Sequence, residues 1–115
     1  MSGASQSSPS GRLVAEAQGV ASVVDEEGRT LEVRRPTALD RLRLLRAAGP
    51  VGAQNDRYFG MAMLAACVTS VDGVPVPFPG NEAGIEASVQ RLGDAGLAAA
   101  ARALEPEDEG DPLGN

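Results

Sequence analysis

The sequence contains no histidine and only one cysteine, Cys67. Histidine is the commonest metal ligand and the usual general base of enzymes, so its absence removes the most frequent routes to metal binding and acid–base catalysis. A single cysteine cannot form an internal disulfide, so the chain needs no oxidising compartment. Without a histidine to act as its base, Cys67 is interpreted as a small buried hydrophobic residue and not as a reactive thiol.

Phosphate-binding loops, a signal peptide and a membrane-length apolar run are also absent. Neither GxxxxGK[ST] nor GxGxxG occurs, and the glycines fall at predicted turns and helix ends. The opening residues MSGASQSSPSG have neither a basic nor an apolar region, so they do not resemble a secretory signal. The most apolar stretch is shorter than the roughly 20 residues that cross a bilayer. These absences predict an intracellular, soluble protein that is not an enzyme and holds no metal or cofactor.

Aromatic residues make up 3% of the chain although hydrophobic residues make up 43%. The core is therefore expected to be small and built from Ala, Val and Leu. A length of 115 residues predicts one domain. Because a small domain buries a modest fraction of its surface, association with a partner or with a second copy of the chain is expected.

The two ends differ in composition from the middle. Residues 1–11 contain five serines, two glycines and a proline, which predicts a disordered tail. Residues 105–115 contain five acids and no base, and they account for most of the net charge of −6. We expect this segment to be a solvated, acidic, disordered tail. A single α+β domain is then expected over residues 12–104.

Two short alternating segments predict a β-hairpin. Residues 20–24 and 30–34 flank the polar turn Asp25-Glu26-Glu27-Gly28, whose glycine can adopt a positive φ. Residues 13–16 could begin a further strand. A hairpin alone is marginal in water, so its apolar face is expected to pack against helices.

The first predicted helix has signals at both ends. Thr37 and Asp40 form a capping-box-like start directly after Pro36. Gly49-Pro50 supplies a left-handed stop followed by a residue that cannot continue the helix. Residues 50–54 are then interpreted as a short connection.

Leucines occur on several sides of this helix. Helical spacing gives an inward stripe of Ala38, Leu42 and Leu45, with Leu39 and Leu44 off the stripe on either side. Those two leucines either widen the core face or remain exposed for contact with a partner. On this assignment Leu42→Asp unfolds the protein, whereas Leu39→Asp or Leu44→Asp weakens partner binding.

A second helix, the most apolar part of the chain, is predicted over residues 55–68 and is capped by Asn55 or Asp56. Its apolar side chains lie on two neighbouring faces, so we expect other elements to cover more than one side. Gly60 within it suggests close approach of a neighbouring backbone. Two interpretations stay open for Tyr58, Phe59, Met61 and Met63, which either pack in the core or form a methionine-containing surface for helical partners.

The remaining chain predicts a turn, an extended arm and two further helices. Residues 70–73 are interpreted as the turn. Prolines at every second position of residues 74–79 restrict this segment to an edge strand or a polyproline-like arm, acting as a covering loop. Asn81 can cap a helix with a stripe of Ile85, Val89 and Leu92 that ends at Gly93, and Asp94 can start another with Leu97, Ala101 and Leu104. The predicted fold is α+β, with an N-terminal β-hairpin packed on a small bundle of three to four helices.

Five arginines within thirteen residues form the one cluster that invites a functional interpretation. They are Arg34, Arg35, Arg41, Arg43 and Arg46. Nucleic-acid binding is one interpretation, but the chain is acidic overall and no aromatic residues interleave with the cluster. We favour a solvated helix face that meets an acidic partner or the acidic tail of the chain itself.

The order of these segments resembles the small tail assembly chaperones of tailed phages and phage-like particles. The resemblance is carried by the hairpin and helix in DEEGRTLEVRRPTALDRLRLL and by the apolar helix in YFGMAMLAACVTSVDG, and it spans residues 20–104. It implies a non-enzymatic protein that binds the long, aggregation-prone tape measure protein in the cytoplasm of the bacterial host. Such a protein keeps its partner soluble during tail assembly and is absent from the finished particle.

The resemblance has no motif strict enough to transfer binding residues. The residues that we predict to contact a partner therefore come from the apolar pattern alone and are Leu39, Leu44, Tyr58, Phe59, Met61 and Met63. The alternative function is a structural tail or connector component that stays in the particle. Binding to nucleic acid or to a membrane is not predicted, and a homo-oligomer remains possible.

Overall fold

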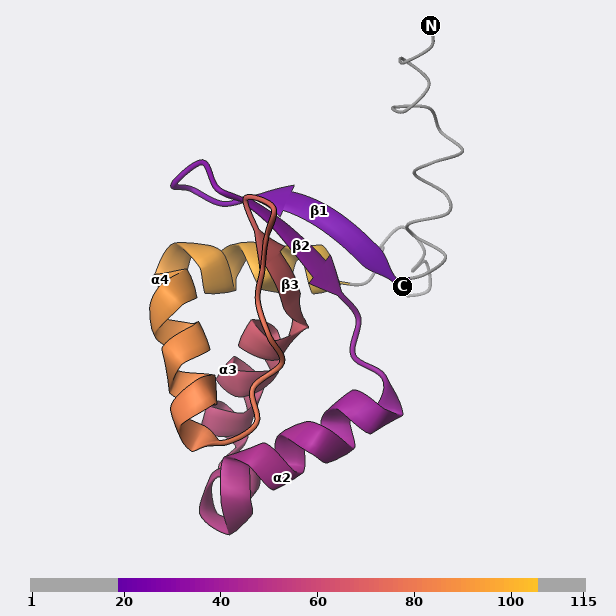
Figure 1. Ribbon diagram of the computed structural model, residues 1–115, viewed down its shortest axis with the longest axis vertical. Helices are drawn as coiled ribbons and strands as arrows, with labels where there is room; N and C mark the ends of the chain where they lie inside the picture. The colour runs from indigo at the N-terminus through magenta and orange to yellow at the C-terminus, as the bar shows by residue number, and fades with distance from the viewer. Residues whose placement is uncertain (1–18, 106–115) are drawn as a thin grey trace, which may run out of the picture.

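The computed structural model describes residues 19–105 and has an α+β fold, as predicted (Figure 1). Two strands come first, followed by two helices, two more strands and a last helix. In chain order they are β1 (Val20–Val24), β2 (Thr30–Arg34), α2 (Ala38–Gln54), α3 (Asp56–Cys67), β3 (Val68–Val71), β4 (Val74–Pro75) and α4 (Glu82–Leu104). The predicted tail over residues 1–11, the strand over 13–16 and all but the first residue of the acidic tail lie outside the described residues.

The four strands form one antiparallel sheet in the order β1-β2-β3-β4. The predicted hairpin is confirmed, with Val20 opposite Arg34 and Val24 opposite Thr30. Strand β3 was not predicted, since Val68 was placed in a helix and residues 70–73 in a turn. Only Asp72 and Gly73 form that turn, with φ of 50° and 83°. A short apolar run that follows a helix without a break has the same hydrophobic pattern whether it continues the helix or enters a buried strand.

The proline-rich arm after β3 packs over the two clusters of buried residues, as expected for a covering loop. Its first two residues form edge strand β4, where the missing amide donor of proline costs no ladder hydrogen bond. The amide of Val76 then donates to the carbonyl oxygen of Thr69 at 2.9 Å. Beyond it, Phe78 packs against the helices.

The ends of α3 and α4 follow local sequence signals. The Asn55 side chain accepts a hydrogen bond from the amide of Tyr58 at 3.0 Å, and that of Asn81 accepts one from Gly84 at 2.8 Å. Gly93 has a φ of 65° and interrupts α4, so the two predicted helices appear as two halves of one element. The alanine-rich second half docks closely, with Ala99 and Ala100 fully buried.

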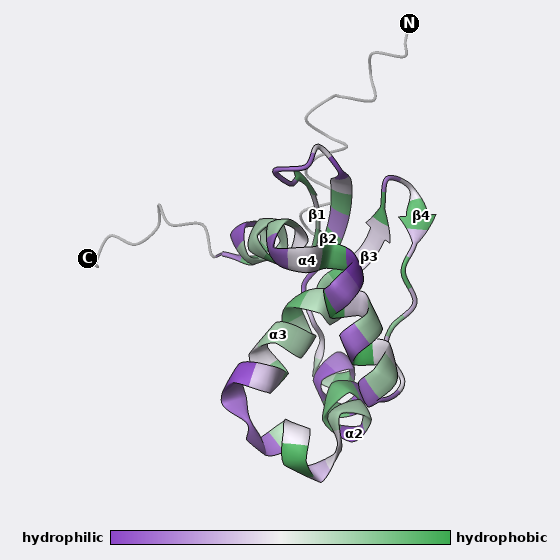
Figure 2. Cartoon of the chain, turned by 90° about the vertical axis from the view of Figure 1, so that its left-hand side faces the viewer, coloured by the Kyte–Doolittle hydropathy of each residue, from purple (hydrophilic) through white to green (hydrophobic). Residues whose placement is uncertain are grey.

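Buried side chains form two clusters rather than one core. The sheet cluster lies between β2, β3, the end of α3 and the part of α4 from Leu92 onward, and it includes Leu31, Val33, Val68, Leu92, Leu97 and Ala100. The helical cluster lies between α2, α3 and the first half of α4 and consists of Leu44, Ala47, Ala48, Ala62, Ala66 and Ile85. Hydrophobic residues run through α3, which contributes to both clusters (Figure 2).

Arg29 joins the hairpin turn to the break in α4. Its Nε donates to Asp25 Oδ2 at 2.8 Å, and the other oxygen of this buried carboxylate accepts the amides of Glu27 and Arg29 at 2.9 Å each. The guanidinium also donates to the carbonyl oxygens of Arg91 at 3.0 Å and Leu92 at 2.7 Å. Because the break at Gly93 ends the first helical half, these carbonyls need partners from outside the helix.

The inward face of α2 differs from the predicted stripe. Leu44 has an exposed fraction of 0%, whereas Leu42 is 63% and Leu45 is 42% exposed. The stripe of Ala38, Leu42 and Leu45 is therefore wrong. Leu44 packs instead with the small residues Ala47 and Ala48 against α3. Gly49 has the predicted positive φ, 79°, and interrupts the helix, but a further helical turn follows it as far as Gln54, so the predicted connection over residues 50–54 is wrong.

The expectation of a close backbone contact at Gly60 is also wrong. Gly60 is exposed, and a Cβ built there would meet no atom within 4 Å. The tight glycines are Gly96, where a Cβ would lie 2.8 Å from the Cβ of Leu92, and Gly52, where it would lie 3.1 Å from the Tyr58 ring. Close packing therefore occurs at the break of α4 and at the junction of α2 with α3.

Candidate protein-binding surface

The outward side of α2 carries exposed leucines. Leu39 is 52% exposed, and Leu42 and Leu45 follow it at intervals of three residues along the same side of the helix. The opposite side of this helix forms part of the helical cluster. The leucines are thus held in the solvent by a docked helix and not by a loose segment.

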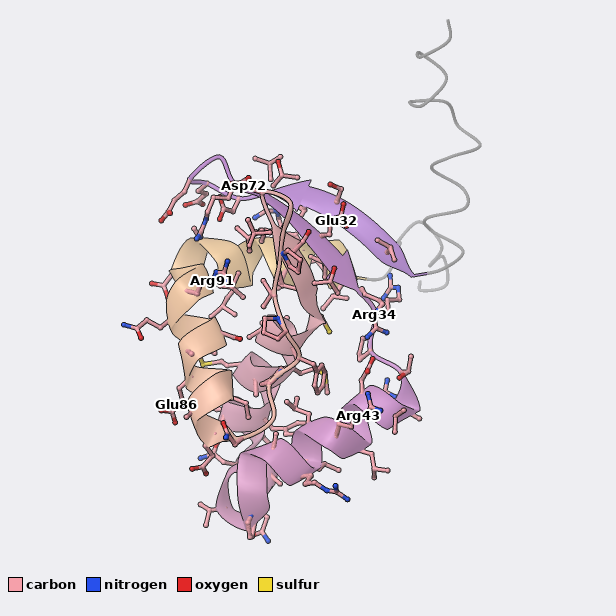
Figure 3. The ribbon with its side chains drawn as sticks, in the orientation of Figure 1. Glu32, Arg34, Arg43, Asp72, Glu86 and Arg91 are labelled. Carbon is pink, nitrogen blue, oxygen red and sulfur yellow. The ribbon has the colours of Figure 1, made fainter. Side chains whose placement is uncertain are left out.

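Two arginines flank these leucines. Leu39, Leu42, Arg43 and Arg46 line a shallow depression of about 430 Å³. We call Leu39, Leu42, Arg43, Leu45 and Arg46 the leucine–arginine face of α2; Figure 3 labels Arg43 on this helix. Neither arginine of the face forms an ion pair within residues 19–105. A surface that is both apolar and basic suits a partner segment that is apolar and acidic.

The predicted cluster of five arginines separates into two groups. Arg34 pairs with Asp40 at 3.0 Å, and Arg35 donates to the carbonyl oxygen of Leu104 at 3.2 Å. The side chains of these two arginines are therefore bound within the fold. Arg41, Arg43 and Arg46 remain on α2, whose only acid, Asp40, is buried. The exposed surface of the helix is therefore positively charged although the whole chain is acidic.

A capping box fixes the start of α2. The Asp40 amide donates to Thr37 Oγ1 at 3.1 Å, and the Thr37 amide donates back to Asp40 Oδ2 at 2.9 Å, as the sequence predicts. The bond from Arg34 to the same carboxylate ties the helix to the end of β2. Partial burial raises the pKa of Asp40, but the Thr37 amide and the Arg34 charge outweigh it and hold the pKa below its ordinary value.

Acid is expected to destabilise the protein through Asp25 and Asp40. Burial raises the pKa of Asp25, but hydrogen bonds from Arg29 and Glu27 outweigh it, so both aspartates have lowered folded pKa values. Their contribution to stability is present above the unfolded pKa and is lost as the pH falls through the folded pKa. The urea midpoint should be flat from about pH 7 to pH 5 and fall below about pH 4. Asp25→Asn and Asp40→Asn should each flatten that fall, and an unchanged acid limb in both variants would contradict this assignment.

A second apolar surface lies between α3 and α4. A groove of about 250 Å³ is lined by Tyr58, Met61, Ala62, Ile85 and Val89, with Glu86 and Gln90 also lining it. Met61 is 46% exposed there, and Figure 3 places Glu86 on the outer side of α4.

The hydroxyl oxygen of Tyr58 is buried beside this groove. It has no hydrogen-bond partner among residues 19–105. Burial, together with the negative charges of Glu86 and Glu82, raises the pKa of this hydroxyl, so it remains a neutral donor at physiological pH. The carboxylate of Glu86 is the acceptor that the fold itself offers to this hydroxyl.

The six predicted contact residues divide into three groups. Leu39 and Met61 are exposed and available to a partner. Tyr58, Phe59 and Met63 are half-buried and pack against the helical cluster, so their packing role is observed. Leu44 is wrong as a contact residue because its side chain lies wholly inside the docked helix pair.

Leu42 and Leu45 are the exposed residues that the sequence interpretation assigned to the core. Four leucines occur within residues 39–45, which is more than one buried stripe of a helix this short can hold. This excess of leucines was the feature of the sequence that could have indicated that some of them face outward. It does not say which ones, because the period alone leaves the rotation of the helix undetermined.

Cys67 is buried as expected, and burial together with the charge of Asp40 raises its pKa to about 11, so the thiol stays protonated. Between residues 19 and 105, no group of three or more His, Cys, Asp or Glu side chains is placed to hold a metal ion. In the same part of the chain no helix is long and apolar enough to span a membrane.

These features make the leucine–arginine face the strongest candidate for a functional surface. It combines exposed apolar area, positive charge and a rigid attachment to the core. Comparison of the chain with protein-family models, with curated proteins and with solved structures found no match.

Proposed function

We propose that this protein is a non-enzymatic tail assembly chaperone of a tailed phage or phage-like particle. It binds the tape measure protein in the cytoplasm of the bacterial host and keeps it soluble while the tail is built. The resemblance in segment order suggests this function, and the leucine–arginine face of α2 supports it. Exposed leucines held on a docked helix provide the apolar contact that such a chaperone needs.

The face suits a helical partner in size and shape. Leu39, Leu42 and Leu45 extend along about 9 Å of the helix axis, which matches less than two turns of a partner helix. Full burial of one leucine contributes about 1.5 to 3 kcal/mol. Arg43 and Arg46 beside the depression would favour a partner stripe flanked by carboxylates and disfavour one flanked by lysines. The groove beside Met61 offers a second apolar contact for a longer segment.

The runner-up function uses the same surface. A structural tail or connector component would cover the leucine–arginine face permanently with a neighbouring subunit in the particle. The two functions differ in where the protein is found after assembly. Detection of the protein in purified tails supports the structural role, and its absence from them supports the chaperone role.

The test is co-expression with the tape measure protein, comparing the unaltered chain with Leu42→Asp. The unaltered chain should raise the soluble fraction of the partner and elute with it. Leu42→Asp should weaken binding about tenfold or more, because it loses the burial of one leucine and adds a charge to an apolar contact.

Val51→Asp is the matched control, since Val51 is also an exposed apolar residue of α2, at 81%, but lies outside the face and beyond Gly49. It should keep full binding. Equal loss in both variants would remove the leucine–arginine face as the contact. No gain in partner solubility with the unaltered chain would remove the chaperone assignment itself.

A further inference from the structure

The leucine–arginine face and the acidic segment of the same chain have complementary charge. Residues 105–115 hold five carboxylates and no base, and Leu113 supplies an apolar side chain. The exposed surface of α2 carries Arg41, Arg43 and Arg46 without an exposed acid between them. Opposite charges that are covalently tethered meet at a high effective concentration.

The acidic segment leaves the fold beside the end of β2, close before α2 in the sequence. Arg35 lies two residues before the Thr37 cap, and its guanidinium donates to the carbonyl oxygen of Leu104 at 3.2 Å. The end of α4 therefore lies beside the end of β2, from which the chain continues through residues 35–37 into α2. In Figure 1 the end of α4 lies behind the sheet, and α2 begins below the end of β2.

The segment is long enough to reach the face. Ten residues after Glu105 can span up to roughly 35 Å when extended. Arg43 and Arg46 lie only about 8 and 12 Å along the helix from Ala38. Even with a detour around the start of α2, the carboxylates can reach both arginines and Leu113 can reach the depression between Leu39 and Leu42.

Several other arginines are already engaged within the fold. Arg29 binds Asp25, Arg34 binds Asp40, and Arg102 donates to the carbonyl oxygen of Val24 at 3.1 Å. Arg57 lies next to Asp56 at the start of α3, beyond the far end of α2. Arg91 of α4 is also exposed without an ion pair within residues 19–105, but it stands alone, whereas Arg41, Arg43 and Arg46 form a group on one helix.

We propose that residues 105–115 bind the leucine–arginine face of α2 in the same chain and shield it until a partner displaces them. Because exposed ion pairs are individually weak, the contact between the segment and α2 opens readily. A partner that buries the leucines more completely then displaces the segment. The binding of the segment does not depend on the identity of the partner, and only the competition rests on the proposed function.

The test is paramagnetic relaxation measured by NMR on the full chain carrying Gly114→Cys with a nitroxide label. Cys67 is buried with a pKa of about 11, so it does not compete for the label. At about 10 mM salt, where screening extends over roughly 30 Å, the amide signals of Leu42, Arg43 and Arg46 should weaken at least about twofold relative to the reduced label. At about 1 M salt they should recover.

The control is the same labelled chain with Glu107→Gln, Asp108→Asn, Glu109→Gln and Asp111→Asn. In this chain the weakening on α2 should disappear, and the hairpin turn at Gly28 serves as a reference that stays unaffected in both chains. Weakening that is absent from α2, or that persists on α2 in the neutral segment, would overturn the inference. Because no partner is present, this result is separate from the co-expression result.

Discussion

Leu44→Asp is expected to unfold the protein, whereas Leu42→Asp, two residues away, leaves it folded. Leu44 is fully buried among Ala48, Ala62 and Ile85. Removal of a buried leucine side chain alone costs about 2 to 5 kcal/mol. A carboxylate left there without a partner adds several kcal/mol more, which together exhausts the roughly 5 to 15 kcal/mol that keeps a small domain folded.

Leu42→Asp is the matched comparison, because it makes the same substitution in the same helix on the solvent side. With 63% of Leu42 already exposed, the change should alter the free energy of unfolding by only about 0.5 kcal/mol. Circular dichroism and urea unfolding of the two variants measure this directly. Unfolding by Leu42→Asp with a folded Leu44→Asp would mean that α2 is rotated relative to the arrangement described above.

Arg29→Met should reduce the free energy of unfolding by about 2 to 4 kcal/mol. Methionine keeps much of the side-chain volume but loses the bonds to Asp25 and to the carbonyls of Arg91 and Leu92. The buried Asp25 carboxylate then lacks its cation, and two carbonyls at the break of α4 lack a donor. The sheet and the two halves of α4 should separate more easily.

Urea unfolding, with Arg57→Met as control, measures this effect. Arg57 is exposed and forms no ion pair within residues 19–105, so its variant should stay within about 0.5 kcal/mol of the unaltered chain. Hydrogen exchange should also quicken near Gly93 in Arg29→Met, since the nearby carbonyls lose their fixed donor. Equal stability of the two variants would show that the Arg29 bonds contribute little to the fold.

The Leu44→Asp and Arg29→Met substitutions act on separate parts of the molecule. Leu44 belongs to the helical cluster that carries the leucine–arginine face, and Arg29 ties the sheet to α4. The proposed contact of residues 105–115 would join the two parts, because the segment leaves from the sheet side and binds on the helical side.

Local signals made much of the fold predictable. The hairpin strands, the Thr37–Asp40 capping box, the Asn55 and Asn81 caps and the break at Gly93 all appear where the sequence indicates. Each depends on residues within a few positions of one another, through a side chain that satisfies a nearby amide or a glycine that adopts a positive φ. For Leu39 and Met61 the sequence left core packing and exposure open, and the structure places both on the surface.

The sequence by itself determined where the helices begin, where α4 breaks at Gly93 and where the hairpin strands lie, because those choices are made by neighbouring residues. Only the tertiary structure decided which leucines of α2 face the core. Because α2 has leucines on several of its sides, the leucine pattern does not fix how the helix is rotated about its axis. That rotation is fixed by the close docking of Ala47 and Ala48 on α3 and by the bond between Arg34 and Asp40. The same holds for β3, which became a strand because β2 offered it an edge to pair with.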